Sequence, residues 1–443
     1  MTDASVDVRT RSEIWKDFAP VERREVATVG VSTLQSQSTS ALLLLLLSLL
    51  ALDVTGSPAS APLVVAAGAL PALLLVRWVR GVNRVLDHRW VMLLSDAGAF
   101  AVALVLFVLA RGDIQAWQIY LGMALFSSFG AFYLPAMRGW VADQTAGLEQ
   151  LTWLNAMLAV STQASVVIGW ALGGVLASTI GIGASLGLCA LSYAFGIGLQ
   201  FVVFVVINRA PLRKVGRTGR TGGAGRTGGT GATEAMAHGQ ADPPAGPSVS
   251  PAPGVWRQVF SPSRLGLFTA SLLAMELSHV LVFSMFVPLL TGGAPERSWV
   301  AGTANACFAL AAMASGVLVS GGALGRWVRS RVPGILLVGF AVQAVFGLSA
   351  GSTVLAIVLY TVVGLLSGGD AALQSEVQNH WRPAGSSQAF AVFGAVQGPA
   401  QLAGSLLIAL LLLHLSVTTV YVGTILTLGM GSGLLLIAAR SRA

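Results

Sequence analysis

The sequence predicts an all-α membrane protein with twelve transmembrane helices in two six-helix bundles and both termini in the cytoplasm. Three observations support this fold class: the composition, the spacing of the apolar runs and the distribution of the basic residues. Of the 443 residues, 55% are apolar and only 10% are charged, whereas a soluble domain carries roughly 25% charged residues. Such a chain cannot cover a folded surface with polar side chains, so we expect much of its surface to face lipid.

Apolar runs of transmembrane length recur along the whole chain. A helix needs about 20 residues to cross about 30 Å of hydrocarbon, where it satisfies its own backbone hydrogen bonds. In the first half, the runs predict six spans at 26–52, 58–79, 90–110, 115–137, 152–179 and 183–207. In the second half, they predict six more at 264–291, 298–320, 332–350, 353–370, 385–412 and 415–439.

The basic residues provide an independent test of this topology. Lys and Arg accumulate in short cytoplasmic loops of membrane proteins. With both termini inside, all of the 26 basic residues except Arg111 and Arg297 lie on the cytoplasmic side. Adding or removing one span would move all later loops to the opposite side, and the basic residues would no longer lie mostly on one side. We therefore interpret the net charge of +8 as a signal of topology and of anionic lipid, and expect no nucleic-acid partner.

The predicted spans divide the chain into five parts. These are an N-terminal tail at 1–25, a bundle at 26–208, a linker at 209–262, a second bundle at 263–439 and a C-terminal tail at 440–443. The Gly-, Arg- and Pro-rich linker predicts a disordered cytoplasmic tether, and a lipid or RNA contact through its arginines is the less favoured alternative. Two similar halves around one long loop suggest a substrate site between them near the bilayer midplane.

Motifs for several enzyme classes are missing from the sequence. No Lys precedes Ser or Thr in the manner of a phosphate-binding P-loop, and no HExxH or CxxC pair suggests a metal site. The GxSxG match at 347–351 ends a predicted span rather than a strand of an α/β fold. We therefore expect no enzyme activity, no metal and no cofactor.

Two stretches of the first half carry a family resemblance. Residues 132–157 read FYLPAMRGWVADQTAGLEQLTWLNAM and residues 169–193 read GWALGGVLASTIGIGASLGLCALSY. These stretches resemble the major facilitator superfamily, and in particular its branch of siderophore and macrolide exporters, which includes enterobactin exporters. The resemblance implies the major facilitator fold. It also implies a secondary transporter that is coupled to protons and exports a small amphipathic molecule such as a drug, an antibiotic or a siderophore.

The fifth predicted helix contains a variant of the family's antiporter motif. The family pattern is Gly-Pro-x-x-Gly-Gly, and the chain has Gly169, Trp170, Gly173 and Gly174, so that Trp170 replaces the proline. Glycines at this spacing also allow helices to approach closely. Close packing is the alternative role for this motif.

The loop between the second and third predicted helices also resembles the family signature. Its sequence is RGVNRVLDHRWVMLLSD, in which Gly81, Asp87, Arg89 and Asp96 fit the pattern and Asn83 replaces an acidic residue. A gate between the halves is a further hypothesis, because charges occupy related loops after helices 4 and 10. Its members would be Arg138, Asp143, Glu376 and Arg382. Ordinary solvated charges at helix ends are the alternative.

Polar residues at membrane depth are costly and therefore suggest a site. Glu276 lies near the middle of the seventh predicted span, and His279 follows three residues later on the same helix face. A carboxyl group there can carry a proton, and an adjacent imidazole can share it. The pair is our predicted proton-coupling site. A structural pair that fastens the helix to its neighbour is the alternative.

The first predicted helix has polar residues where a lipid-facing helix would have leucine. Gln35 and Gln37 are candidate hydrogen-bonding contacts of the substrate cavity, and interhelical packing is the alternative. On the fourth predicted helix, Phe126, Phe132 and Tyr133 are candidate aromatic lining residues. For each of them, packing in the core is the alternative.

These observations predict a multi-pass protein of the cell inner membrane. Its expected partners are a small-molecule substrate, protons and the lipid bilayer, and we expect a monomer. Import of a metabolite or siderophore remains an alternative to export. A sensor or scaffold of the same fold without transport activity is the second alternative, because Asn83 and Trp170 depart from the family motifs.

Overall fold

The structure is a computed structural model. It describes residues 15, 18–144, 148–209, 263–319, 322–369, 373 and 386–441. Apart from an isolated bridge residue at Leu86, all regular secondary structure within these ranges is helical. This helical secondary structure agrees with the predicted all-α membrane protein.

Six consecutive helical segments form the first half of the molecule. They are α2 (Pro20–Thr55), α3 (Ser60–Leu74) with α4 (Val76–Val85), α5 (His88–Leu109), α6 (Ala116–Gln144), α7 (Leu148–Thr179), and α8 (Ile182–Gln200) continued by the π-helix η1 (Phe201–Ile207). Helix α2 begins before the predicted span 26–52, because Pro20 occupies its first turn and Glu22 Oε2 accepts a hydrogen bond from Ala19 N at 2.8 Å. Glu25 therefore lies inside the helix.

The second half also consists of consecutive helical segments. Its elements are α10 (Arg264–Thr291), the short η2 (Pro295–Arg297), α11 (Ser298–Val319), α12 (Gly322–Leu348), α13 (Thr353–Leu366), α15 (Ser386–Leu411), α16 (Val417–Thr424), the π-helix η4 (Ile425–Gly429) and α17 (Met430–Ser441). The last helical segment of each half contains π-helical residues. Such local widening occurs frequently at functional sites.

The helices occupy all of the predicted span positions. Among the described residues, nine helical stretches are long and apolar enough to cross a membrane, and the bent pair of α3 and α4 would be a tenth. Two shorter apolar helices, Thr353–Leu366 and Val396–Leu411, lie at the tenth and eleventh predicted spans. The total of twelve crossings and the cytoplasmic position of the termini stay predictions.

The second predicted span, 58–79, is not one straight helix. Helices α3 and α4 meet at an angle of 58°. The bend lies at Leu75, which ends α3 and precedes α4, four residues after Pro71. Beyond the break, α4 places Arg77, Arg80 and Arg84 on one side, while Trp78 on another side is 70% exposed. This is the pattern of an amphipathic helix at a membrane surface.

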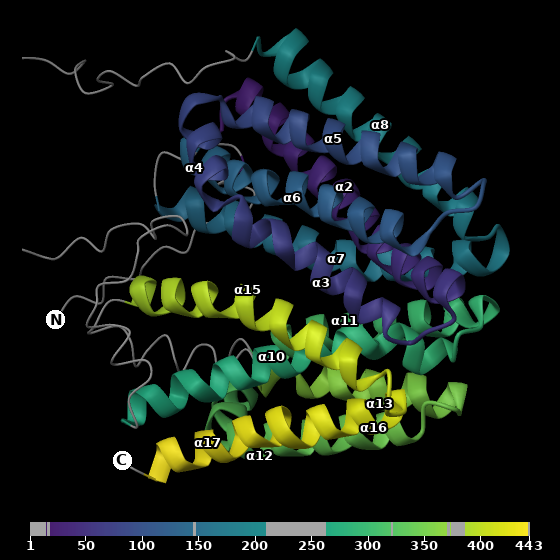
Figure 1. The fold of residues 1–443 in the computed structure, drawn as a ribbon. Helices are drawn as coiled ribbons and strands as arrows, with labels where there is room; N and C mark the ends of the chain where they lie inside the picture. The colour runs from purple at the N-terminus through teal and green to yellow at the C-terminus, as the bar shows by residue number, and fades with distance from the viewer. Residues whose placement is uncertain are drawn as a thin grey trace, which may run out of the picture.

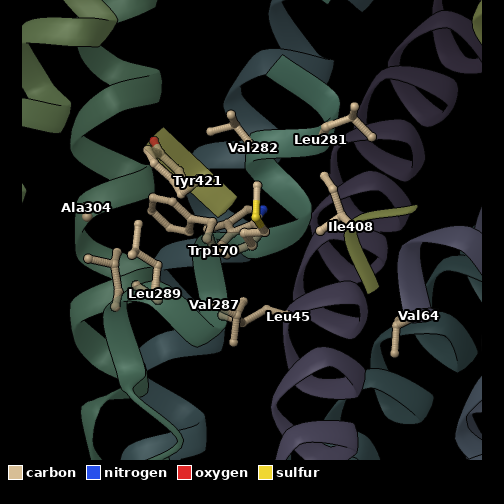
Figure 2. Packing of buried hydrophobic residues seen from close by; sticks show 14 of the residues in the cluster. Leu45, Val64, Trp170, Leu281, Val282, Val287, Leu289, Ala304, Ile408 and Tyr421 are labelled. Atoms are coloured by element: carbon tan, nitrogen blue, oxygen red, sulfur yellow. The ribbon is translucent and has the colours of Figure 1, made fainter. Parts of the chain in front are cut away.

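The two halves lie side by side as separate layers of helices (Figure 1). Helix α7 of the first half packs on α11 of the second, and α3 packs on α15. Glycine permits the first of these contacts, since a Cβ atom on Gly174 would lie 2.9 Å from the Cα of Gly302. The largest hydrophobic cluster continues across this contact, and Figure 2 shows Trp170 of α7 among its side chains.

Outward-facing surfaces of the described helices are apolar. Exposed residues include Val105 on α5, Leu191 and Phe195 on α8, Val317 on α11 and Val354 on α13. A water-soluble monomer rarely exposes continuous apolar surface of this kind, whereas hydrocarbon accommodates it. The helices therefore pack polar side chains inward and present aliphatic side chains to lipid.

Candidate functional site

A cavity with a mixed lining lies among helices of both halves. It has a volume of about 420 Å³, which falls within the range of about 300–1,000 Å³ typical of small-molecule sites. Helices α10, α11, α12 and α13 contribute most of its wall, and α2, α3, α7 and α15 contribute Leu44, Val65, Val166 and Gln401. The cavity therefore lies mainly in the second half and touches the first.

Aliphatic and aromatic side chains make up most of the cavity wall. The polar side chains among the lining residues are His279, Asn305, Gln343, Tyr360, Ser367 and Gln401. The lining contains no Arg, Lys, Asp or Glu among the described residues. A wall of this kind suits an amphipathic guest, because apolar contacts supply most of the area and a few polar groups fix its orientation.

Two of the lining amides are buried with one atom each lacking a hydrogen-bond partner among the described residues. Asn305 is 2% exposed and Gln343 is 3% exposed. The Asn305 Nδ2 donor and the Gln343 Oε1 acceptor are both unsatisfied. A buried polar group in this state costs about 1–3 kcal/mol of stability. Sequence analysis missed both residues, although the criterion applied to Glu276, a polar residue inside a predicted span, would have found them.

The predicted coupling residues occupy one side of α10. His279 lines the cavity, and the centroid of its ring lies 5.7 Å from that of Phe340. Glu276 is half-buried one turn earlier on the helix and is not a lining residue. A proton that moved between the two groups would pass next to the cavity wall. The coupling role itself stays a prediction.

The glutamines of α2 lie outside the lining of this cavity. Gln35 Nε2 donates hydrogen bonds to Ser192 Oγ of α8 at 2.8 Å and to Thr39 Oγ1 at 3.3 Å. Gln37 is half-buried on the same helix. In this conformation Gln35 connects two helices of the first bundle, so the structure provides an interhelical contact and no cavity contact for it.

The three predicted aromatic lining residues on α6 pack within the first bundle. The Phe126 ring lies edge-on to Tyr193, with centroids 6.0 Å apart. Tyr133 is 3% exposed, and its hydroxyl lies 3.3 Å from Thr33 Oγ1. Phe132 packs against the hydrophobic cluster that contains Tyr133. None of the three lines the 420 Å³ cavity, and their proposed substrate contacts stay predictions.

Asp96, predicted as part of the loop signature, is buried between three helices. It lies on α5 and is 3% exposed. Ser36 Oγ of α2 donates to its Oδ1 at 2.9 Å, and Gln200 Nε2 of α8 donates to its Oδ2 at 2.6 Å. Both carboxyl oxygens therefore have a donor, which offsets the cost of burial.

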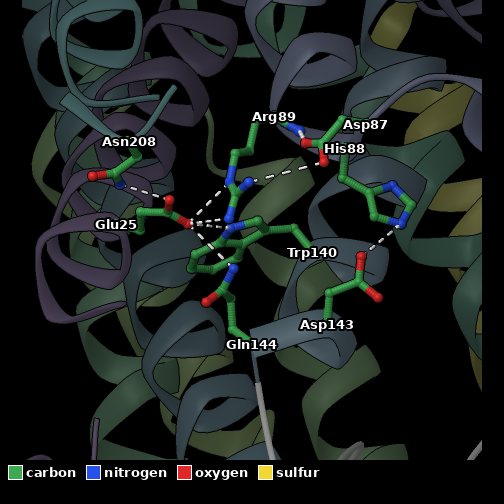
Figure 3. Close-up of polar contacts among 8 residues, drawn as sticks. All are labelled: Glu25, Asp87, His88, Arg89, Trp140, Asp143, Gln144 and Asn208. Carbon is green, nitrogen blue, oxygen red and sulfur yellow. Dashed lines mark hydrogen bonds and ion pairs between the residues drawn. The ribbon is translucent and has the colours of Figure 1, made fainter. Parts of the chain in front are cut away.

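A second polar cluster surrounds Glu25 near the start of α2, as Figure 3 shows. The Arg89 guanidinium contacts Glu25 Oε2 at 2.9 Å, and both Trp140 Nε1 and Gln144 Nε2 donate to the same oxygen at 3.3 and 3.2 Å. Asn208 Nδ2 donates to Oε1 at 2.6 Å. Glu25 thus connects α2 with α5, α6 and the end of η1. We call these five residues the Glu25 cluster.

The Glu25 cluster was missed by sequence analysis, which assigned Glu25 to the tail. The family-like loop contributes Arg89 to it, while Asp87 caps α5 by accepting a hydrogen bond from Arg89 N at 2.9 Å. Gly81 lies exposed on α4, and a Cβ there would meet no atom within 4 Å. Of the signature residues, Asp87 therefore caps a helix and Arg89 joins the Glu25 cluster.

The hypothetical gate is only partly described. Arg138 is exposed on α6. Asp143 lies near the end of α6, where its Oδ2 is 3.5 Å from His88 Nε2 of α5 (Figure 3). Glu376 and Arg382 lie outside the residues that the structure describes, so the gate stays a hypothesis.

The helix-5 motif mediates close packing in two directions. A Cβ on Gly169 would collide with the Ser38 carbonyl oxygen of α2, and one on Gly173 would lie 2.9 Å from Leu42 and Leu45. Gly174 faces the other way, toward α11. Trp170 reaches the second half, and its ring lies 4.9 Å from that of Phe283, a residue of the cavity wall.

Comparison with solved structures shows the fold alone. The nucleoside transporter NupG has a TM-score of 0.63 at 13% identity, with 96% of this chain and 99% of that one covered. A bacterial homologue of the iron transporter ferroportin, solved in an inward-facing state, has a TM-score of 0.63 at 14% identity, with 98% of this chain and 100% of that one covered.

Sequence relatives are lysophospholipid transporters. The lysophospholipid transporter LplT of Yersinia enterocolitica is 27% identical over 257 residues, which make up 56% of this chain and 54% of the relative. LplT of Cronobacter sakazakii is 36% identical over 84 residues, or 19% of this chain and 21% of the relative. The chain thus matches about half of the first relative's length and less of the second.

The match to a family model is much longer. It extends from residue 29 to residue 405 and so includes most of both helical halves and all the residues that line the cavity. Together with the fold, this match identifies the chain as a member of the Major Facilitator Superfamily, and therefore as a multi-pass membrane transporter.

Proposed function

We propose that this chain is a secondary transporter that moves a small amphipathic molecule across the cell inner membrane by alternating access. The observation that carries the proposal is the 420 Å³ cavity, which is bounded by helices of both halves and has an apolar wall with few polar groups. A rocking movement of one half against the other would open such a site to either side in turn.

The relatives narrow the chemistry of the candidate substrate. Both relatives are named as transporters of lysophospholipids, which are amphiphiles with one acyl chain. This supports lipid-like amphiphiles ahead of the siderophores and macrolides that the motifs of helices 4 and 5 suggested. Export is the proposed direction, and proton exchange through Glu276 and His279 is the proposed source of energy.

Uptake into proteoliposomes provides the test of transport. Purified protein would be reconstituted in both orientations, and fluorescent or radiolabelled single-chain amphiphiles would be followed with and without an imposed proton gradient. We expect accumulation that depends on the protein and on the gradient. Absence of protein-dependent flux for every amphiphile tested would instead favour the sensor or scaffold alternative.

The coupling step has its own test. In Glu276→Gln, we expect gradient-driven accumulation to be lost while exchange down a substrate gradient continues, because the amide cannot carry the proton. Glu296→Gln, an exposed carboxylate on η2, is the matched control and should behave as the parent protein does. Undiminished uphill transport by Glu276→Gln would remove that residue from the coupling role.

A further inference from the structure

Two buried amides in the cavity wall each have one atom without a hydrogen-bond partner among the described residues, and these two atoms have opposite hydrogen-bonding roles. Asn305 on α11 presents a free donor, Nδ2, and Gln343 on α12 presents a free acceptor, Oε1. Both side chains line the cavity and are at least 97% buried. Protein interiors seldom leave such atoms without a partner. A bound group that accepts from Asn305 and donates to Gln343 would satisfy both of them at once.

The charge of that group follows from the rest of the wall. No Arg, Lys, Asp or Glu is among the described lining residues, and His279 is the ionisable group of the wall that can become cationic. An ionic head group would lose its hydration there without gaining a permanent counter-charge, which is unfavourable in an apolar site. A neutral hydroxyl or amide would lose less hydration and gain two hydrogen bonds.

We propose that Asn305 and Gln343 form a head-group subsite that selects an uncharged amphiphile whose polar end both donates and accepts hydrogen bonds, such as a glycerol ester. The subsite rests on the proposed transport function and specifies its substrate class. In it, a ligand hydroxyl donates to Gln343 Oε1, and a ligand oxygen accepts from Asn305 Nδ2. Aliphatic wall residues such as Val280 and Ile335 contact the acyl chain.

Three soluble probes with the same acyl chain separate the possible outcomes. They are 1-octanoylglycerol, its phosphorylated counterpart octanoyl lysophosphatidic acid, and methyl octanoate, which accepts hydrogen bonds but donates none. Binding to the full-length protein in phosphatidylcholine nanodiscs would be measured by calorimetry, with empty nanodiscs as the blank. We expect 1-octanoylglycerol to bind about tenfold more tightly than either comparator, which is the effect of about 1.4 kcal/mol.

Variants of the subsite test the two side chains. Gln343→Met and Asn305→Leu keep the approximate size of the side chain but remove its hydrogen-bonding group. Each should weaken 1-octanoylglycerol binding about tenfold, while the midpoint of thermal unfolding without ligand stays equal or rises, because an unsatisfied buried group has been removed. A merely structural amide would give the opposite result, with a lower midpoint. Gln163→Met, at an exposed glutamine of α7 outside the lining, is the control.

The outcomes distinguish this inference from the proposed function. Tighter binding of lysophosphatidic acid than of octanoylglycerol, or unchanged affinity in Gln343→Met and Asn305→Leu, would overturn the subsite and leave amphiphile transport intact. Protein-dependent transport of no amphiphile, charged or neutral, would overturn the proposed function itself.

Discussion

Ser298 Oγ, at the first residue of α11, donates a hydrogen bond to the backbone carbonyl of Gly174 on α7 at 3.1 Å. This bond crosses from one half of the molecule to the other. At the same place, a Cβ on Gly174 would lie 2.8 Å from the Ser298 carbonyl oxygen and 2.9 Å from the Gly302 Cα. The two helices are thus in backbone contact on the side of the membrane that the charge distribution predicts to be external.

The first prediction concerns this contact. Gly174→Val places two methyl groups where the backbone of α11 lies, and overpacking of this kind costs about 1–3 kcal/mol. If alternating access closes the molecule here, the variant should reduce initial transport rates in proteoliposomes by about tenfold or more. Gly316→Val on α11, where a Cβ meets no atom within 4 Å, should transport normally. A fully active Gly174→Val would contradict a functional role for this close contact.

The second prediction concerns the Glu25 cluster. Glu25→Ala would remove the 2.9 Å ion pair of the half-buried Arg89 guanidinium, which keeps a longer contact to Asp87 Oδ2 at 3.9 Å, and would remove the acceptor of three further donors. Removing one partner of a buried pair costs about 3–5 kcal/mol. We expect the lower end of this range, because the Arg89 side chain is 20% exposed. The midpoint of thermal unfolding in detergent should therefore fall by several degrees.

Two further variants provide controls for the cluster. Glu296→Ala, an exposed carboxylate in η2, should leave the midpoint unchanged. The double variant Glu25→Leu with Arg89→Met should be more stable than Glu25→Ala alone, because it removes both charges together. Equal midpoints for Glu25→Ala and the parent would show that the cluster adds no net stability.

The third prediction is the orientation in the membrane. In a background with Cys189→Ala and Cys307→Ala, single cysteines at the exposed positions Asp113 and Glu296 should react with a membrane-impermeant maleimide added to intact cells. A cysteine at the exposed position Arg84 should react only after the cells are opened. Labelling of position 84 in intact cells would overturn the predicted arrangement with both termini inside.

The fourth prediction concerns the amphipathic helix α4. Its arginines at 77, 80 and 84 share one side of the helix and should contact anionic head groups, at about 1 kcal/mol for each charge near the surface. Unfolding midpoints would be compared between phosphatidylglycerol and phosphatidylcholine nanodiscs. For the parent protein, we expect a higher unfolding midpoint in phosphatidylglycerol than in phosphatidylcholine. This difference should become smaller when all three arginines are replaced by glutamine, and the midpoint in phosphatidylcholine should not change. An equal gain for variant and parent would exclude the contact.

Several features of the fold could be predicted from the sequence because they depend on the solvent alone. A backbone segment in hydrocarbon must satisfy its own hydrogen bonds, so apolar runs of the right length had to become helices. The bend of the span 58–79 near Leu75 was not part of the prediction, because an apolar run shows the length of a span and not its straightness.

The candidate site was much less predictable. His279 lines the cavity, whereas Gln35 bonds to a neighbouring helix and Phe126 packs in the core, and the roles predicted for all three stay predictions. Each of these residues lies inside a predicted span, and spacing along one helix cannot show which face meets lipid, another helix or open space. For the same reason, the sequence could not show that Asn305 and Gln343 line a cavity.

The sequence by itself determined that this protein lies in the membrane as helices, since low charge and regular apolar runs leave no other way to satisfy the backbone in lipid. Tertiary structure alone decided which polar side chains are paired and which face a cavity. Glu25 and Asp96 obtained partners from other helices, while Asn305 Nδ2 and Gln343 Oε1 have none among the described residues. The physical reason is that hydrogen-bond satisfaction depends on atoms distant in sequence, which only the packing of the two halves brings together.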